Sequence, residues 1–219
     1  MAKEDECCRL DGLSFRVADS WRIDLDLLVG TASPDRTSFK NKPARQGLGG
    51  MPLLMTSSTN IRLYVDGDRA AVWSIFQATV APGDTYVFDP DISEADALAY
   101  WLNPNNSTFV AEREGRIVGT YLLKANQPGL GSHVANAAFM VSPSARGLGV
   151  GRLMGEHCLV EARRRGFRAM QFNFVVSTNH AAVRLWKELG FSIVGTLPGA
   201  FAHCVYGFVD AYVMYRSIE

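Results

Sequence analysis

Apolar and polar residues follow two regular periods from about residue 60 onward, whereas the first part of the chain follows neither. Alternation with a period of two predicts strands, and apolar residues three and four positions apart predict helices. Residues 1–58 instead contain the Ser-, Thr-, Gly- and Pro-rich run SPDRTSFKNKPARQGLGGMPLLMTSST. We therefore expect an N-terminal arm over 1–58 that is flexible or loosely packed, followed by one folded domain over 59–219.

The elements predicted after the arm alternate in an order typical of a layered protein. In DRAAVWSIFQATV, Val72, Ile75 and Phe76 share one helical face, and Ser93 with acidic residues around it predicts the start of a second helix. The order of elements implies a mixed sheet with crossover helices, an α/β or α+β fold. The expected strands are 61–65, 108–114, 117–125, 134–141, 169–177, 191–197 and 209–216, and the expected helices are 68–80, 93–102, about 150–165 and 179–189.

Composition and charge narrow the class of partner. The 219 residues are 47% apolar and 20% charged with a formal net charge of zero, which is typical of a globular protein. Arg163, Arg164 and Arg165 form the one basic run and suit a helix C-terminus, so neither nucleic acid nor a membrane is expected as partner. The four cysteines lack C-x-x-C spacing and the N-terminus is charged, which favours a cytoplasmic protein. A homodimer is compatible with the sequence.

Three glycines in SARGLGVGRLM, residues 144–154, stand where a predicted strand gives way to a helix. Glycine in a helix costs roughly 0.5 to 1 kcal/mol relative to alanine, so the cluster needs a reason in the backbone. Such a turn directs several N–H groups and the positive end of a helix dipole at one place, and Arg146 adds a charge. The spacing fits neither a P-loop nor a dinucleotide fingerprint. The segment is therefore either a site for another phosphate ligand or a purely structural turn.

Two linked motifs carry a resemblance to a known family. VSPSARGLGVGRLM resembles the acetyl-CoA pyrophosphate loop of the GNAT superfamily of N-acetyltransferases, and STNHAAVRLWKELGFSIVG, about 35 residues later, resembles its second cofactor element. The resemblance covers roughly residues 60–219. It implies a mixed, mostly antiparallel sheet of about six to seven strands, with the fourth and fifth splayed apart, flanked by about four helices. It also implies acetyl-CoA as the acyl donor, bound by Phe139, Met140, Val141, Arg146, Gly147, Leu148, Gly149, Val150, Gly151, Asn179, Ala182 and Trp186. Asn179 is also a natural N-cap residue.

The chemistry of acetyl transfer sets what the site must contain. Attack by a neutral amine needs a polarised carbonyl and a leaving thiolate but no enzyme nucleophile, so we expect Cys158 to belong to the core. The resemblance implies that the backbone of Met140 holds the thioester carbonyl. Many relatives have a tyrosine acid where this chain has Trp186, so the thiolate must take its proton from water or another residue, with Tyr121 and Tyr206 as candidates.

Two asparagines in apolar strands suggest the acceptor. An unpaired amide at Asn136 or Asn173 would cost about 1 to 3 kcal/mol, so each either bonds to neighbouring backbone or binds a carboxylate of the acceptor. ANAAFMVSP, QFNFVVSTN, AVRLWKELGF and GAF together resemble the GNAT branch that includes azetidine-2-carboxylate acetyltransferases, which act on small imino acids. This resemblance implies that Asn136 and Asn173 contact the acceptor, with Asn173 at the catalytic centre.

The remaining polar residues point to structural roles. The four histidines have no ligand spacing, so no metal is expected. We expect His203 in a surface connection before the last strand, and a structural hydrogen bond at Asp210. The predicted function is acetyl transfer from acetyl-CoA to the amine of a small molecule, such as an amino or imino acid, by direct attack in a ternary complex. The alternatives are a catalytically silent acyl-CoA-binding module and a protein N-terminal or lysine acetyltransferase.

Overall fold

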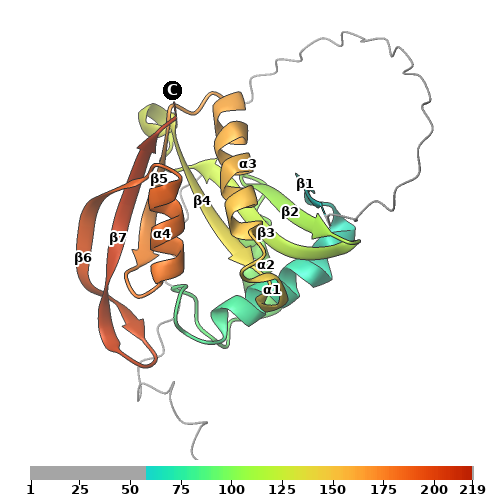
Figure 1. Cartoon of the computed structure of the whole chain (residues 1–219), viewed down its shortest axis with the longest axis horizontal. Helices are drawn as coiled ribbons and strands as arrows, with labels where there is room; N and C mark the ends of the chain where they lie inside the picture. The colour runs from blue at the N-terminus through green and yellow to red at the C-terminus, as the bar shows by residue number, and fades with distance from the viewer. Residues whose placement is uncertain (1–57, 219) are drawn as a thin grey trace, which may run out of the picture. The chain divides into compact units, whose positions relative to one another are not determined.

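The computed structural model describes residues 58–218, and Figure 1 shows them as one twisted sheet with helices on both faces. The predicted arm, apart from Ser58, lies outside the described residues. The strands are β1 (Thr59–Leu63), β2 (Ser107–Arg113), β3 (Arg116–Ala125), β4 (Val134–Val141), β5 (Ala169–Val176), β6 (Ser192–His203) and β7 (Gly207–Ser217). The helices are α1 (Arg69–Val80), α2 (Glu94–Trp101), α3 (Val150–Arg164) and α4 (His180–Glu188), with short 3₁₀ turns η1 (Asp66–Asp68), η2 (Gly129–Gly131) and η3 (Pro143–Ala145).

The sheet opens between its fourth and fifth strands. Its strand order is β1-β2-β3-β4-β5-β7-β6, and every neighbouring pair is antiparallel except β4 and β5. That parallel pair is joined only at Val134 with Ala169 and at Ala135 with Met170. Beyond these residues the two strands separate, and the segment between β4 and β5 is called the gap below. The predicted fold class and the predicted splay are confirmed.

Side chains of β4 alternate between two apolar cores, as the pleat of a strand requires. Ala135, Ala137 and Phe139 belong to the core covered by α3 and α4. Ala138 and Met140 belong to the core covered by α1 and α2. The two faces of the sheet are therefore distinct around the gap, one facing the glycine-rich loop that precedes α3 and the other facing the first two helices.

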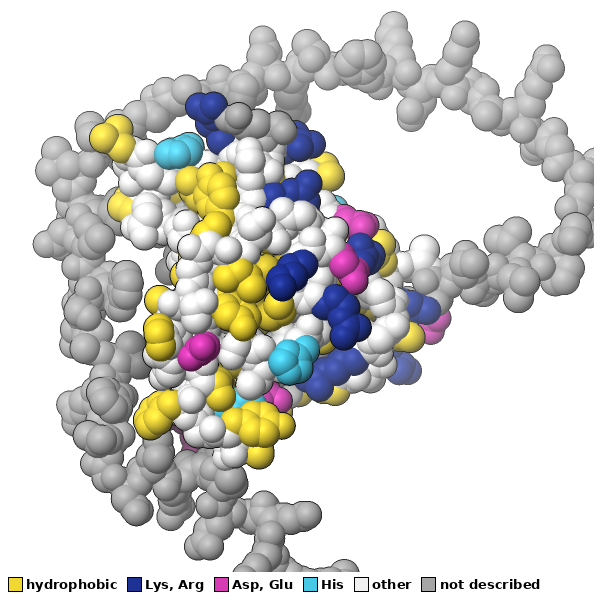
Figure 2. Space-filling model, turned by 60° about the vertical axis from the view of Figure 1, so that its left-hand side comes forward, with side chains coloured by type: hydrophobic (Ala, Val, Ile, Leu, Met, Phe, Trp, Pro, Cys, Tyr) yellow, Lys and Arg dark blue, Asp and Glu magenta, His cyan; other side chains and the backbone are white. Residues whose placement is uncertain are grey.

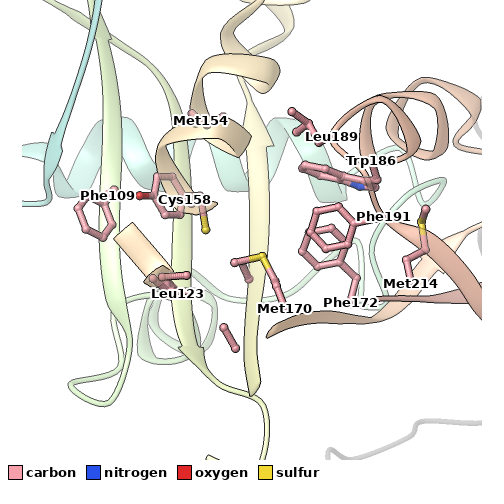
Figure 3. Packing of buried hydrophobic residues seen from close by; sticks show 14 of the residues in the cluster. Phe109, Leu123, Met154, Cys158, Met170, Phe172, Trp186, Leu189, Phe191 and Met214 are labelled. Carbon is pink, nitrogen blue, oxygen red and sulfur yellow. The ribbon is translucent and has the colours of Figure 1, made fainter. Parts of the chain in front are cut away.

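The core under α3 and α4 divides into two neighbouring groups of side chains (Figure 3). Cys158 of α3 lies with Phe109 on one side of β4, and Cys158 is fully buried, as predicted. On the other side Trp186 of α4 packs on Phe172 and Phe191, with the ring centres of Trp186 and Phe172 4.7 Å apart. Large aromatic rings thus hold α4 against β5, the strand on the far side of the gap from β4.

The helix ends follow the signals in the sequence. The N–H of Asp96 donates to the hydroxyl oxygen of Ser93 at 3.1 Å, which is the predicted N-cap of α2. Gly166 and Gly190 follow α3 and α4 with φ of 83° and 84°, a conformation that favours glycine at helix C-termini. None of the helices within residues 58–218 is both long enough and apolar enough to cross a membrane.

The last two strands are longer than predicted. The expected connection over 198–208 is wrong, because β6 runs to His203 and β7 begins at Gly207. A register irregularity between Leu197 and Phe201 accommodates Pro198, which an edge strand tolerates because its missing N–H has no neighbour to bond. Asp210 accepts the N–H of Gly199 at 2.9 Å, which confirms its predicted structural role. Figure 2 looks toward the side that carries β6, where apolar side chains reach the surface in separate groups.

Candidate active site

The glycine-rich loop owes its glycines to backbone conformation. Gly147 and Gly149 both have φ of 78°, and a Cβ added at either position would meet no atom within 4 Å. Open space surrounds them, so the left-handed conformation, which costs other residues roughly 1 to 2 kcal/mol, is what requires glycine. Gly149 is the N-cap of α3 and provides no side chain to bond the first N–H groups of the helix. The first hydrogen bond of α3 joins the N–H of Leu153 to the carbonyl of Gly149, so the N–H groups of Val150, Gly151 and Arg152 have no partner within the helix.

The third glycine of the cluster has a different role. An added Cβ at Gly151 would lie 3.5 Å from Leu185 and 3.9 Å from Val141, so this position faces α4 and β4. One turn later, a Cβ at Gly155 would lie only 2.6 Å from Leu189 and 3.2 Å from Trp186. These two glycines allow α3 and α4 to approach closely, which brings the starts of both helices to the same side of the gap.

Asn179 caps the start of α4. Its side-chain oxygen accepts the N–H of Ala182 at 3.1 Å, so the N-cap interpretation is confirmed. Contact of Asn179 or Ala182 with a cofactor stays a prediction. Trp186, on the next turns of α4, is 7% exposed and its ring centre lies 4.8 Å from that of Phe139, which points its side chain at the gap.

A tyrosine that the sequence analysis did not consider lies at the gap. The hydroxyl of Tyr86, from the segment between α1 and α2, donates to the carbonyl of Phe139 at 2.8 Å and accepts the N–H of the same residue at 3.0 Å. Burial raises the pKa of this hydroxyl above its ordinary value, so it is neutral. One side chain therefore satisfies both backbone groups of a residue on the open edge of β4.

The register of β4 fixes which residues present their backbone to the gap. Backbone groups along an antiparallel strand point alternately to its two sides. Ser142 donates to a carbonyl of β3, whereas both groups of Phe139 point away from β3. Phe139 and Val141 therefore face the gap, and the backbone of Met140 faces β3. The role predicted for Met140 stays a prediction, and the register favours Phe139 and Val141 for it.

Three asparagines share one hydrogen-bonding centre at the closed end of the gap. Asn136 of β4 and Asn173 of β5 both donate to the side-chain oxygen of Asn126, at 3.2 and 2.7 Å. Gln171 in turn donates to the oxygen of Asn173 at 2.8 Å. We call Asn126, Asn136, Asn173 and Gln171 the amide cluster. The structure thus brings the two predicted asparagines together and adds Asn126, which follows β3 and belongs to no motif found in the sequence.

The amide cluster lies on the sheet face opposite the core of α3 and α4. Asn136 alternates with Ala135 and Ala137, which belong to that core, so its side chain points to the face of α1 and α2. The same holds for Gln171 and Asn173, which flank the core residue Phe172. The gap therefore has the aromatic side of α4 on one face and polar amides on the other.

The sequence matches a known family over this region. The acetyltransferase (GNAT) family matches residues 70–191, which include the glycine-rich loop, the gap and α4. The chain belongs to the GNAT family. N-Acetyltransferase aca1 of Schizosaccharomyces pombe is 37% identical over 111 residues, which are 50% of this chain and 53% of that protein. A mycothiol acetyltransferase of Thermomonospora curvata is 36% identical over 92 residues, 42% of this chain and 29% of that protein. The chain thus spans about half the length, or less, of these curated relatives.

Solved structures of acetyltransferases share the fold. A GCN5-related N-acetyltransferase from Kribbella flavida is 42% identical with a TM-score of 0.70, over 73% of this chain and 97% of that one. A putative acetyltransferase from Salmonella typhimurium, solved with acetyl-CoA, has a TM-score of 0.66 at 24% identity over 74% of this chain and 95% of that one. The second likeness concerns the fold alone.

Other residues considered for GNAT chemistry lie away from the gap or are engaged elsewhere. The hydroxyl of Tyr121 is 2.7 Å from Nδ1 of His157, and burial raises the pKa of this tyrosine. Tyr206 lies in the turn between β6 and β7 with 68% of its surface exposed. His203 ends β6, and its Nδ1 accepts the N–H of Val205. Within residues 58–218, no group of three or more potential metal ligands gathers.

Proposed function

We propose that this protein transfers the acetyl group of acetyl-CoA directly to the amine of a small molecule. The observation that carries the proposal is the gap between β4 and β5, which has a glycine-rich loop at its open end and the amide cluster at its closed end. A gap with both features can hold a donor and an acceptor at the same time. Family membership makes acetyl-CoA the donor that fits this arrangement.

The donor would bind through backbone groups. Its pyrophosphate would meet the N–H groups at the start of α3, where the dipole favours an anion, with the exposed Arg146 supplying charge. The extended arm would then run along the open edge of β4, where Val141 and Phe139 present hydrogen-bonding groups in the manner of an added strand. Asn179, Ala182 and Trp186 would line the α4 side of the arm.

The acceptor would bind at the amide cluster. Asn136 and Asn173 can each donate one further hydrogen bond from their amide nitrogens, since each nitrogen carries two hydrogens and one is used for Asn126. Lys124 stands directly opposite Asn136 in the register of β3 and β4, so a positive charge lies on the same face. Amide donors beside a cation favour a carboxylate, which supports an amino or imino acid as the acceptor.

The chemistry needs little from the protein beyond placement. A neutral amine held between the amide cluster and the thioester attacks the carbonyl carbon, and hydrogen bonds from the edge of β4 stabilise the oxyanion. No cysteine is required, and burial raises the pKa of the Cys158 thiol, which suits its place in the core. Trp186 has no acidic proton to offer the departing thiolate, so water in the open gap would supply it.

One assay separates this function from its alternatives. Release of CoA thiol would be measured with acetyl-CoA and panels of amino acids, imino acids, their decarboxylated analogues, polyamines and peptides. We expect turnover with carboxylate-bearing amines. Turnover only with peptides would favour a protein acetyltransferase, and binding of acetyl-CoA without turnover would favour the silent module that the replacement of tyrosine by Trp186 suggests.

Variants then connect the acceptor to the amide cluster. Asn173→Ala removes one charge-assisted hydrogen bond and should lower kcat/KM for the acceptor by about 1.5 to 3 kcal/mol, roughly 10- to 150-fold, with little change in acetyl-CoA affinity. Asn105→Ala changes an exposed asparagine in the turn before β2 and serves as the matched control. If Asn173→Ala lowers only the melting temperature, the cluster is structural and the proposed acceptor class is wrong.

A further inference from the structure

Tyr86 is held rigidly over the gap by the segment that joins α1 and α2. Its ring stacks on Phe88 and meets the edge of Trp101, with ring centres 6.1 and 6.4 Å away. The same segment is tied to the turn between β6 and β7, because the N–H of Cys204 bonds to the carbonyl of Gly83. A side chain fixed by aromatic packing aims its hydroxyl with little loss of rotamer freedom.

The hydroxyl stands at the position where the proposed donor would end. Phe139 is the second gap-facing residue from the glycine-rich loop, after Val141, and an extended arm that starts at the loop reaches it last. Because Tyr86 engages both the N–H and the carbonyl of Phe139, its oxygen is within 3.0 Å of the backbone donor that would hold the thioester oxygen.

We infer that Tyr86 is a catalytic hydrogen-bond donor that stabilises the oxyanion together with the N–H of Phe139. This inference rests on the proposed acetyl transfer. With the donor bound, the N–H of Phe139 would turn from the tyrosine oxygen to the carbonyl oxygen of the thioester, and the O–H of Tyr86 would leave the carbonyl of Phe139 for the same oxygen. Two donors would then converge on the atom where negative charge develops.

The step balances without proton loss from Tyr86. The amine nitrogen forms a bond to the carbonyl carbon while the C=O π electrons move to oxygen, where the two donors stabilise them. When the electrons return, the C–S bond breaks and its electron pair leaves with sulfur. The proton lost by the amine passes through water to the thiolate, giving the amide and the free thiol of CoA.

The environment of the tyrosine favours this role over that of a proton donor to sulfur. Burial raises the pKa of Tyr86, and a phenol with a raised pKa keeps its proton even beside a thiolate. A hydroxyl that stays neutral is well suited to stabilise a transient oxyanion. Tyr86 would thus contribute to the chemistry without replacing the tyrosine acid that is missing at Trp186.

The test removes the hydroxyl and keeps the ring. Tyr86→Phe should lower kcat with the acceptor found in the thiol-release assay by roughly 100-fold, the usual effect of losing one oxyanion donor. The dissociation constant of acetyl-CoA should change by less than about threefold, and the alkaline limb of the pH profile should keep its position. Tyr100→Phe is the control, because Tyr100 packs on the same Phe88 but is 43% exposed.

Four results would overturn the inference. An unchanged kcat with a lower melting temperature would make the hydroxyl structural, and an unchanged kcat with tighter acetyl-CoA binding would make it a plug that the donor displaces. A wild-type protein that turns over no acceptor would refute the proposed function together with the inference. An active wild type with an unaffected Tyr86→Phe variant would refute the inference alone. If Tyr86→Phe does not fold, the infrared C=O stretching frequency of acetyl-CoA bound to the wild type provides the test. Two hydrogen-bond donors should lower this frequency below its value in water, and a frequency that is not lowered would refute the inference.

Discussion

Replacing Asn126 by aspartate would test the amide cluster with almost no change of shape. The side-chain oxygen of Asn126 accepts hydrogen bonds from Asn136 and Asn173, and a carboxylate at this position would accept both. The positions of the two donating asparagines should therefore be retained. What changes is the charge, because a negative group now lies behind the amides that are proposed to bind the acceptor's carboxylate.

The size of the effect follows from the contacts. A carboxylate bound by Asn136 or Asn173 would lie one hydrogen-bonded side chain away from position 126, at roughly 6 Å. Two unit charges at this distance repel by about 0.7 kcal/mol in water and about 2.8 kcal/mol at the effective dielectric constant of a protein surface. We expect a decrease in kcat/KM of roughly 3- to 100-fold for carboxylate-bearing acceptors, and the decrease should shrink at high salt because solvent reaches the cluster.

The assay compares each acceptor with its decarboxylated analogue in thiol release. Asn126→Asp should discriminate against the carboxylate form only, whereas Asn126→Ala should weaken both forms and lower the melting temperature by a few degrees through loss of two hydrogen bonds. Equal effects of Asn126→Asp on both forms would refute the reasoning, because the lost activity would then come from altered packing and not from charge.

Three further predictions concern the donor site, the helix end and the arm. Acetyl-CoA at 100 times its dissociation constant should stabilise the wild type by about 2.7 kcal/mol and raise its melting temperature, and Gly149→Val should abolish this increase. Gly166→Val is the control, because Gly166 has a similar φ of 83° and is equally open, and this variant should keep the increase. Loss of the increase in both variants would contradict the assignment of the loop to the donor. Hydrogen bonds from Arg164 and then Arg165 lower the pKa of Glu161 to about 2, so its stabilisation is complete above the unfolded pKa near 4.5 and is lost as the pH falls toward 2. As the pH falls, the free energy of unfolding of the wild type should therefore decrease by about 1 to 2 kcal/mol more than that of Glu161→Gln. This is less than the full pKa change would give, because Arg164 is two-thirds exposed and solvent screens its charge. Parallel curves of unfolding free energy against pH for the two proteins would disprove this. A fragment of residues 58–219 should fold and bind acetyl-CoA, and aggregation of this fragment in gel filtration would show that the arm belongs to the core.

Local signals in the sequence were enough for most of the fold. Strand alternation, the Ser93 cap and the glycines after α3 and α4 each act within a few residues, so the pattern contains them. The extent of β6 could not be predicted in this way. Pro198 and Gly199 read as loop residues, and only the pairing with β7 shows that an irregularity at a sheet edge accommodates them.

The candidate site was predictable only where a motif was continuous in the chain. The glycine-rich loop and the start of α4 are each contained in one short segment. Tyr86 meets Phe139 from 53 positions away, and Asn126 meets Asn173 from 47, so no local pattern reveals either contact. The packing of Gly151 beside Leu185 and Val141 could not be predicted, because the sequence does not show which helix lies next to a glycine, and its contact with the cofactor stays a prediction.

The close contact of α3 and α4 at Gly155 means that the two helices proposed to bind the donor are brought together during folding and not by the ligand. The missing side chain lets Leu189 and Trp186 rest directly on α3, which fixes the distance between one helix start and the other. The conformational entropy lost in bringing the two helix starts together is lost on folding, before acetyl-CoA binds. A ligand that contacts both helix starts would therefore bind a preorganised surface. A larger residue at position 155 would therefore weaken acetyl-CoA binding from a position that the ligand never touches.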